Sequence, residues 1–424
     1  MPTRSFWVWL HRWAGLAMAG FLIVVGLTGS VLAFREEIDT WLNPDLLTVA
    51  KRDAALLDPI TLRERAAALY PGAEIDTVPL RIEATRSAPF TLAPSLGHFM
   101  SNFVQFYLDP YTGEKLGERV LWSGPSLERR NIVSFLYRLH FSLSLPWSTG
   151  SLGGYILGVT ALVWTIDCFV SFYLTFPLSR GKGGEPSANR KSWLKRWKPA
   201  WRIKWNGGFY RVNFDVHRAF GLWTWAMLFV FAWSSVAFNL SEVYRPVMGL
   251  TFDMRSASDA LPALDTPLDR PALSWSEALA RGRVLMAETA ARRGFRVLRE
   301  ESLDLDREHG VYLLNVLSSW DVSKEGATIL VFDANTGEFK GQRGIGSEGV
   351  GQTITLWLVW LHMAQVFGLP MKIFVCVMGL VIAALSVTGV YIWWKKRRAR
   401  RHHAALSASR VAAVRKREFE QSRP

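Results

Sequence analysis

The sequence predicts an α-helical membrane protein in which four transmembrane helices form two tandem parallel repeats, each carrying a small α+β domain. Three observations lead to this fold class. Hydrophobic residues make up 50% of the 424 residues, and 20 of the residues are Trp, which is too apolar for an ordinary soluble chain. Four apolar runs are long enough to cross a bilayer, and the two halves of the chain repeat one another.

The four apolar runs are each 22 to 25 residues long and carry almost no charge. About 20 helical residues, at about 1.5 Å each, cross a hydrocarbon core of roughly 30 Å, so each run predicts one transmembrane helix. A signal peptide is the alternative for the first run. That run exceeds the usual apolar core of about 7–15 residues, and its matching run is internal, so we expect a retained helix that begins near Ser5. The runs are Trp13 to Phe34, Leu152 to Phe176, Ala219 to Leu240 and Ile373 to Trp394.

Three pairs of matching segments occur in the same order in the two halves. The segment that begins at His11 (HRWAGLAMAGF) resembles the one that begins at His217 (HRAFGLWTWAM). The segment around His140 (RLHFSLSLP) resembles the one around His362 (WLHMAQVFGLP), and a turn motif lies between, DPYTGE in the first half and DANTGE in the second. The matched histidines are 206 and 222 residues apart and the matched turns are 224 apart, so only the connecting lengths differ.

Between the apolar runs, each half turns polar and combines helical with strand periodicity. In the first half, TLRERAAALY has helical spacing, and TVPLRIEA, PFTLAP and NFVQFYL alternate as strands do. The second half repeats this order, with WSEALARGRVLMAETAARRG as the helix and FRVLREESLDL, GVYLLNVL and ATILVFD as the strands. Each half therefore predicts one α+β domain. The apolar stretches Asn131 to Leu145 and Thr353 to Phe367 are too short to span and predict helices at the outer membrane surface.

The net charge of +14 is concentrated in short flanks of the apolar runs. Residues 180–218 hold 11 Lys or Arg against two acids, and residues 395–424 hold 11 against two. This positive-inside pattern places both termini and the middle linker in the cytoplasm and the two α+β domains on the other side of the membrane. Because one bilayer rule explains these charges, the expected partner is the lipid bilayer and no nucleic-acid partner is expected.

Together these signals divide the chain into eight segments. The predicted segments are 5–34 (first transmembrane helix), 35–126 (first α+β domain), 127–178 (outer surface helix and second transmembrane helix), 179–216 (basic cytoplasmic linker), 217–240 (third transmembrane helix), 241–348 (second α+β domain), 349–398 (outer surface helix and fourth transmembrane helix) and 399–424 (basic cytoplasmic tail).

Four of the eight histidines form the two matched pairs, and each lies beside an apolar run. Parallel repeats are related by a pseudo-twofold axis along the membrane normal, so His11 is expected to face His217 near the cytoplasmic side and His140 to face His362 near the outer side. Two facing imidazoles in an apolar bundle supply the axial ligands of a six-coordinate haem, so the pairs predict two haem sites. The alternative is an interfacial or hydrogen-bonded histidine, the usual role of a single one at a membrane boundary.

Three arginines lie close to these histidines in the sequence. Arg12 and Arg218 directly follow their histidines and Arg138 precedes His140 by two residues. Their planar guanidinium groups suit pairing with haem propionates. For Arg12 and Arg218 the positive-inside rule is an equally complete explanation.

Asp167 is the one acid well inside an apolar run. Ionisable groups there are costly and often functional, so a role in proton movement and a buried hydrogen bond are both open. Its near-match in the second half is Thr388, which favours a structural polar contact. Paired catalytic carboxylates, a Walker loop, GxGxxG and HExxH are absent, so no motif predicts nicotinamide binding or ATP hydrolysis.

With these residues in place, the sequence resembles the PepSY-associated transmembrane-helix family of iron-regulated bacterial inner-membrane proteins. The resemblance is carried by HRWAGLAMAGFLIVVGLTGSVLAFREEID, VHRAFGLWTWAMLFVF, DPYTGE, DANTGE and VTGVYIWWKKRR, in the family's order and across most of residues 5–398. Two departures stand out. VHRAF lacks the Trp of HRW, and IDCF stands where the last span has VTGV.

Members of this family include ferric-siderophore reductases that hold two haems and reduce iron in the periplasm. The resemblance implies two periplasmic PepSY-like domains and two b-type haems with His11, His217, His140 and His362 as axial ligands of the iron. It implies a haem-dependent oxidoreductase with a ferric siderophore as substrate and periplasmic iron-uptake proteins as partners. The 424 residues contain no flavodoxin-like or ferredoxin-reductase segment, so the electron donor, cytoplasmic or quinol, stays unidentified.

Two other functions fit the same residues. The PepSY-like domains could bind a periplasmic peptidase or siderophore-processing partner, with the helices as anchors only. Replacement of the four histidines would then leave function intact. Alternatively, haem-dependent electron transfer could serve another acceptor through a partner subunit, which growth on specific iron sources would distinguish.

Overall fold

The computed structural model describes residues 3–92, 103–121, 125–145, 151–178, 192–256, 261–346 and 349–421, without the side chains of Phe103 and of residues 403–421. Residues 179–191 of the predicted linker and the end of the predicted strand PFTLAP lie outside the described residues. The chain forms two compact units. Unit 1 comprises Met1–Leu27, Thr160–Ala232 and Met378–Pro424, and unit 2 comprises Thr28–Val159 and Trp233–Val377.

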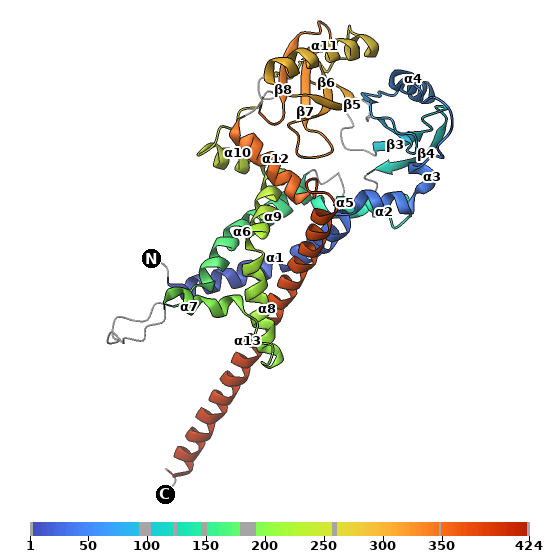
Figure 1. Ribbon diagram of the computed structural model, residues 1–424. Coiled ribbons are helices and arrows are strands. Elements are labelled where there is room, and N and C mark those ends of the chain that lie inside the picture. The colour runs from blue at the N-terminus through green and yellow to red at the C-terminus, as the bar shows by residue number, and fades with distance from the viewer. Residues whose placement is uncertain are drawn as a thin grey trace. The chain divides into compact units, whose positions relative to one another are not determined.

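Three helices in the described ranges are long and apolar enough to cross a membrane (Figure 1). They are α1 (Arg4–Leu32), α6 (Leu152–Thr175) and the part of α13 (Leu369–Gln421) up to His402. They coincide with the first, second and fourth predicted runs, and α1 begins ahead of His11, as expected. The protein is therefore a membrane protein that combines apolar helices with β-sheets.

The third predicted run is not one straight helix. It forms α8 (Phe209–Trp223) and α9 (Trp225–Asn239), which meet at a bend of 68° and can together make one further span. The break falls at Thr224, whose hydroxyl donates to the carbonyl of Phe220 at 2.7 Å. A hydroxyl that bonds back to the preceding turn bends a helix, and the Trp225 indole is held by the Cys168 carbonyl at 2.8 Å. The sequence prediction of a helix over 217–240 missed this break.

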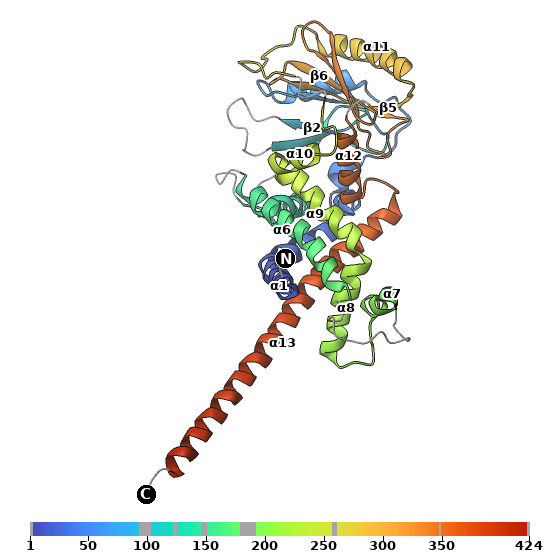
Figure 2. The same cartoon turned by 90° about the vertical axis from the view of Figure 1, so that its left-hand side faces the viewer.

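Unit 2 contains a five-stranded antiparallel sheet with the order β1-β5-β6-β7-β8. Along β6 the burial alternates, which is the period-two pattern of a sheet with one face in the core. Helix α11 packs on that face through Leu279, Leu285 and Met286 (Figures 1 and 2), begins at a capping box and ends at Gly294. The elements are β1 (Thr77–Pro79), β5 (Val297–Asp306), β6 (Val311–Ser318), β7 (Thr328–Asp333), β8 (Phe339–Arg343) and α11 (Trp275–Arg293).

A smaller sheet with the order β2-β3-β4 forms the other soluble module of unit 2. Phe90 and Phe106 stack at 5.6 Å between ring centroids and pack with Leu62 of α4 in a separate core. Asp58 caps α4 by accepting from the Ile60 N–H at 2.8 Å. The elements are β2 (Ala88–Leu92), β3 (Phe103–Leu108), β4 (Lys115–Leu121) and α4 (Pro59–Leu69).

Strand β1 differs from the prediction of one α+β domain for each half. It comes from the first half of the chain but pairs with β5 of the second half, with Val78 opposite Leu303. Both side chains are fully buried in the larger core, which explains the pairing. Pro79 has no N–H for a ladder and therefore suits the sheet edge that β1 forms.

The two matched turn motifs adopt the same structure. Asp109 Oδ1 accepts from the N–H of Tyr111 and Thr112, and Asp333 Oδ1 accepts from the N–H of Asn335 and Thr336. Each turn then places its glycine in the left-handed region, with φ of 71° at position 113 and 70° at position 337. The turns therefore end strands β3 and β7 in the same way.

Short helices connect the sheets to the long helices. The two stretches predicted as surface helices form α5 (Ile132–Ser142) and α12 (Val350–His362), and a histidine lies in the last turn of each. The other short elements are α2 (Arg35–Leu42), α3 (Pro44–Leu47), α7 (Trp193–Trp197), η2 (Lys198–Trp201) and α10 (Ser241–Gly249).

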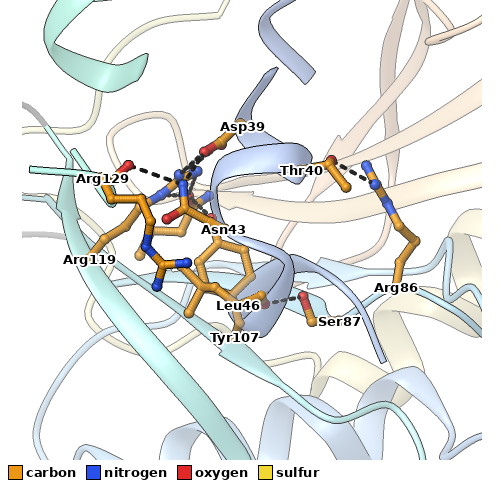
Figure 3. A network of polar contacts seen from close by, with 10 residues as sticks. Asp39, Thr40, Asn43, Leu46, Arg86, Ser87, Tyr107, Arg119 and Arg129 are labelled. Carbon is orange, nitrogen blue, oxygen red and sulfur yellow. Dashed lines mark hydrogen bonds and ion pairs between the residues drawn. The ribbon is translucent and has the colours of Figure 1, made fainter. Parts of the chain in front are cut away.

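A buried ion pair fixes α2 to the three-stranded sheet (Figure 3). The Arg119 guanidinium donates to both oxygens of Asp39, at 2.7 and 2.9 Å, and also to Gln105 at 2.9 Å. Asn43 donates to the same carboxylate at 2.8 Å and is fully buried. Since side-chain exposure is 9% for Arg119 and 12% for Asp39, each charge depends on the other for its compensation.

Replacement of Arg119 by Met should destabilise this module by about 3–5 kcal/mol, because the Asp39 charge stays buried without its partner. Amide hydrogen exchange of β3 and β4 in the detergent-solubilised protein measures the loss. Arg129→Met is the matched control. Its ion pair with Asp45 is about half exposed and should contribute less than about 1 kcal/mol. Equal protection in the two variants would contradict this assignment.

A buried carboxylate lies in the larger sheet. Burial raises the pKa of Asp304 above its ordinary value of 3.8, against the hydrogen bonds from Thr77, Ser302 and Asn315, which lower it. The Asn315 amide donates to Asp304 at 2.5 Å and the Ser302 hydroxyl at 2.8 Å. Since the unfolded carboxyl loses its proton at a lower pH than the folded one, folding is disfavoured as pH rises from 3.8 through the folded pKa.

The variant Asp304→Asn should therefore gain stability relative to the wild type as pH rises from 3.8 toward neutrality. Thermal unfolding of the two full-length proteins, compared at each pH, measures this difference. A difference that shrinks with rising pH would contradict the raised pKa.

Candidate functional site

The first histidine pair lies in unit 1. His11 comes from α1 and His217 from α8, and their ring centroids are 6.2 Å apart with an angle of 57° between the ring planes. Each histidine is followed directly by an arginine, Arg12 or Arg218. The structure thus brings together the two residues that the duplication matched.

The second histidine pair lies in unit 2. His140 ends α5 and His362 ends α12, and their ring centroids are also 6.2 Å apart, with 81° between the planes. The Phe238 ring packs against His362 at 5.4 Å. Both predicted pairs are therefore in contact, while the role of these residues as ligands stays a prediction.

Each of the four imidazoles has its Nδ1 atom bonded to a side-chain oxygen from another helix. Asp167 bonds His11 at 2.9 Å through either oxygen, and Thr388 bonds His217 at 2.9 Å. Thr28 bonds His140 at 3.0 Å and Ser234 bonds His362 at 2.6 Å. Since Nδ1 is bonded in all four rings, the second ring nitrogen, Nε2, is the one that a metal ion would take.

Two of the tautomers follow from the partners. The Asp167 carboxylate has no proton to give, so His11 Nδ1 carries the hydrogen and donates. The Thr388 hydroxyl donates to the Leu385 carbonyl at 3.0 Å, so it accepts from His217 Nδ1–H. In their neutral forms both rings of this pair therefore have the lone pair on Nε2, which is the form that binds iron.

The four partners follow the same duplication as the histidines. Thr28 and Ser234 are 206 residues apart, the same separation as His11 and His217. Asp167 and Thr388 are 221 residues apart, close to the 222 that separate His140 and His362. In each half of the chain, the two histidines are therefore hydrogen-bonded to two side-chain oxygens of the same half. Each pair then combines one histidine from each half.

Glycine follows the bonding threonine in two of these places and makes room for an imidazole. A side-chain carbon at Gly29 would lie 3.0 Å from Cε1 of His140, and one at Gly389 would lie 3.2 Å from Cε1 of His217. Both distances are tighter than ordinary contact. The Thr-Gly dipeptides therefore supply the hydrogen-bond partner of the ring and the space that the ring occupies.

A cavity of about 410 Å³ opens beside His11 and His217 in unit 1. Its volume falls in the range of about 300–1,000 Å³ typical of small-molecule and cofactor sites. The walls are mostly apolar and include three glycines, at positions 15, 221 and 389, which leave flat surfaces. Four basic side chains also line it, namely Arg4, Arg12, Arg218 and Lys396.

The three predicted arginines differ in their surroundings. Arg12 and Arg218 both line this cavity. Arg218 donates to buried Asp215 at 2.8 Å and to the Pro199 carbonyl at 2.7 Å, so part of its charge is compensated. Arg138 is 2% exposed and donates to the Leu145 carbonyl at 2.5 Å, next to the end of α5.

Sequence analysis left a proton role and a buried hydrogen bond open for Asp167 and favoured a structural polar contact. The structure shows such a contact, although its partner, the candidate ligand His11, was not predicted. The signal was its match to Thr388, which holds the equivalent histidine. Sequence reasoning missed Lys396, which was counted only in the basic flank 395–424 although it lines the cavity. It lies 178 residues from Arg218 and 384 or more from Arg12 and Arg4, so only the fold brings these side chains to one cavity.

The spacing of both pairs fits two imidazoles on one metal ion. A metal–imidazole bond is about 2 Å long and a ring centroid lies roughly 1.1 Å behind its nitrogen, so the centroids lie about 6 Å apart. The separation of 6.2 Å in both pairs agrees with this value. Among the described residues no three His, Cys, Asp or Glu side chains gather as a metal site.

Comparison with known families finds a match over nearly the whole chain. The family model described as the PepSY-associated TM region matches residues 8–396. The matched range includes all four paired histidines and their four oxygen partners. No curated protein matches the chain significantly.

Proposed function

The chain belongs to the PepSY-associated TM family, as the resemblance predicted, and from this premise we propose that it is a di-haem reductase of the bacterial inner membrane. Electrons pass from a cytoplasmic or quinol donor across the membrane to a ferric siderophore in the periplasm, and ferrous iron is released for uptake. The single observation that carries the proposal is the pair of 6.2 Å contacts, His11 with His217 and His140 with His362.

The proposed fold has four spans in two tandem parallel repeats, with α8 and α9 together as the third span. The bend in this span does not prevent crossing, because backbone groups at the break keep partners: the Thr224 N–H donates to the Phe220 carbonyl, and the Thr224 carbonyl accepts from the N–H groups of Met227 and Leu228. The basic flanks keep both termini and the linker in the cytoplasm. The two soluble modules of unit 2 are then the periplasmic PepSY-like domains.

In this proposal His11 and His217 would hold one b-type haem, and His140 and His362 would hold the other. Each haem would supply the exchange of single electrons. The chain's own residues do the rest. The oxygen partners bond each Nδ1, glycines 29 and 389 leave space for two of the rings, and mostly apolar walls line the cavity beside His11 and His217.

Arg12 and Arg218 would bind the propionates at that pair, and their position in the cavity lining supports this role. Lys396 lines it as well and can act as a further cation. Arg138 serves the second pair in the same way, although its bond to Leu145 also stabilises the end of α5.

The overall reaction balances with one electron for each iron. Each ferric ion takes one electron and becomes ferrous, and a quinol that gives two electrons reduces two ferric ions and releases two protons. Reduction frees the metal because hard oxygen ligands that suit ferric iron hold ferrous iron weakly. No bond in the siderophore itself has to break.

Detergent-purified protein should contain two low-spin b-type haems per chain in a pyridine-haemochrome assay. His11→Ala or His217→Ala should remove one haem, and His140→Ala or His362→Ala should remove the other, because each loses an axial ligand. His309→Ala is the matched control and should keep both, since His309 pairs with Asp306 in the larger sheet. A wild-type protein without haem would contradict the proposal and favour the alternative function, a membrane-anchored binding protein.

Reduced protein should be reoxidised by a ferric siderophore, and a ferrous chelator should trap one iron for each electron delivered. The measurement is stopped-flow absorbance of the haem bands under anaerobic conditions. Reoxidation by other acceptors only, with no iron trapped, would assign the electrons to a different substrate.

A further inference from the structure

One of the four imidazole partners differs chemically from the others. His217, His140 and His362 are bonded by hydroxyl groups, whereas His11 is bonded by the carboxylate of Asp167. The difference is confined to one half of the chain, because the equivalent of Asp167 is Thr388. It is also confined to one of the two pairs.

The carboxylate is well placed to influence the ligand. Asp167 is 8% exposed, both of its oxygens lie 2.9 Å from His11 Nδ1, and it is the only acid among the described residues that line the cavity. Arg4, Arg12, Arg218 and Lys396 also line this cavity and act in the opposite electrostatic sense. Of these charged groups, Asp167 is bonded directly to an imidazole of the pair, so its effect reaches the metal through the ligand.

We propose that Asp167 is a positioning residue that lowers the reduction potential of the haem held by His11 and His217 below that of the haem held by His140 and His362. This inference rests on the proposed function. A carboxylate that accepts from Nδ1–H makes the imidazole a stronger donor, and its negative charge favours ferric over ferrous iron. Hydroxyl partners supply the hydrogen bond without the charge.

The asymmetry gives electron transfer a direction. An electron that enters at the site of lower potential moves downhill to the site of higher potential. In the proposed orientation the His11–His217 pair lies on the cytoplasmic side, next to the donor. Asp167 thus distinguishes two sites that the duplication would otherwise make alike.

The test is a spectroscopic redox titration of Asp167→Thr, which gives His11 the partner type that His217 has. The background is His140→Ala with His362→Ala, so that a single haem is titrated. The ferric-to-ferrous ratio at a fixed potential should fall at least tenfold, which corresponds to a rise of about 59 mV for one electron. An unchanged potential with the haem retained would overturn the inference while the proposed function stands.

The double variant Asp167→Thr with Thr388→Asp moves the carboxylate to the opposite imidazole of the same pair. It should bring the potential back toward the wild-type value, whereas a role in packing alone predicts a second loss. If Asp167→Thr does not retain haem, Asp167→Asn keeps the shape and an oxygen acceptor and should show the same rise. Haem loss in both single variants, in protein that is otherwise folded, would make Asp167 a requirement for binding and overturn its tuning role. Absence of haem in the wild type would instead defeat the proposed function.

Discussion

The hydrogen bond at Nδ1 of each imidazole is the interaction on which both histidine pairs depend. An imidazole in apolar surroundings has two polar nitrogens, and neither can be left unsatisfied without a cost. A side-chain oxygen on another helix takes up one nitrogen in all four cases. The orientation of each ring is therefore set by helix packing and not by a loop.

The same constraint explains the small residues beside the site. A hydroxyl can reach an imidazole only where the helix backbone comes close, and a glycine next to it provides that approach. Two adjacent residues supply the hydroxyl and the close approach in two places, Thr28 with Gly29 and Thr388 with Gly389. The two other partners, Asp167 and Ser234, lie beside Cys168 and Ser235, which are also small. Close helix contact and ring orientation are thus two results of one local sequence.

Much of this arrangement was predictable, because the duplication carries long-range information. His11 and His217 share neither a helix nor a local motif, yet their matching sequences predicted their contact, as they did for His140 and His362. Local patterns likewise predicted the long helices, the two turn motifs and the helix α11. Asp167 was noticed as a buried acid, but its partner could not be read from a single apolar run.

Other features depend on contacts that leave no local pattern. At the break, the Thr224 hydroxyl donates to the Phe220 carbonyl. The apolar sequence of the run does not predict this hydrogen bond. The pairing of β1 with β5 depends on two buried core side chains, Val78 and Leu303, that are far apart in the chain. Lys396 reaches the cavity only because α13 continues past the apolar run.

The pairing of β1 with β5 also has a consequence for biosynthesis. During synthesis Val78 cannot pair until Leu303 has been made, 225 residues later. At a synthesis rate of roughly 5–20 residues per second, the strand stays without its partner for about 10–45 s on the ribosome. During that time Pro79 limits its pairing with other strands, because it offers no N–H. The three-stranded sheet can form from the first half alone, but the five-stranded sheet needs β1 from the first half and β5 to β8 from the second, which binds the two halves into one folding unit.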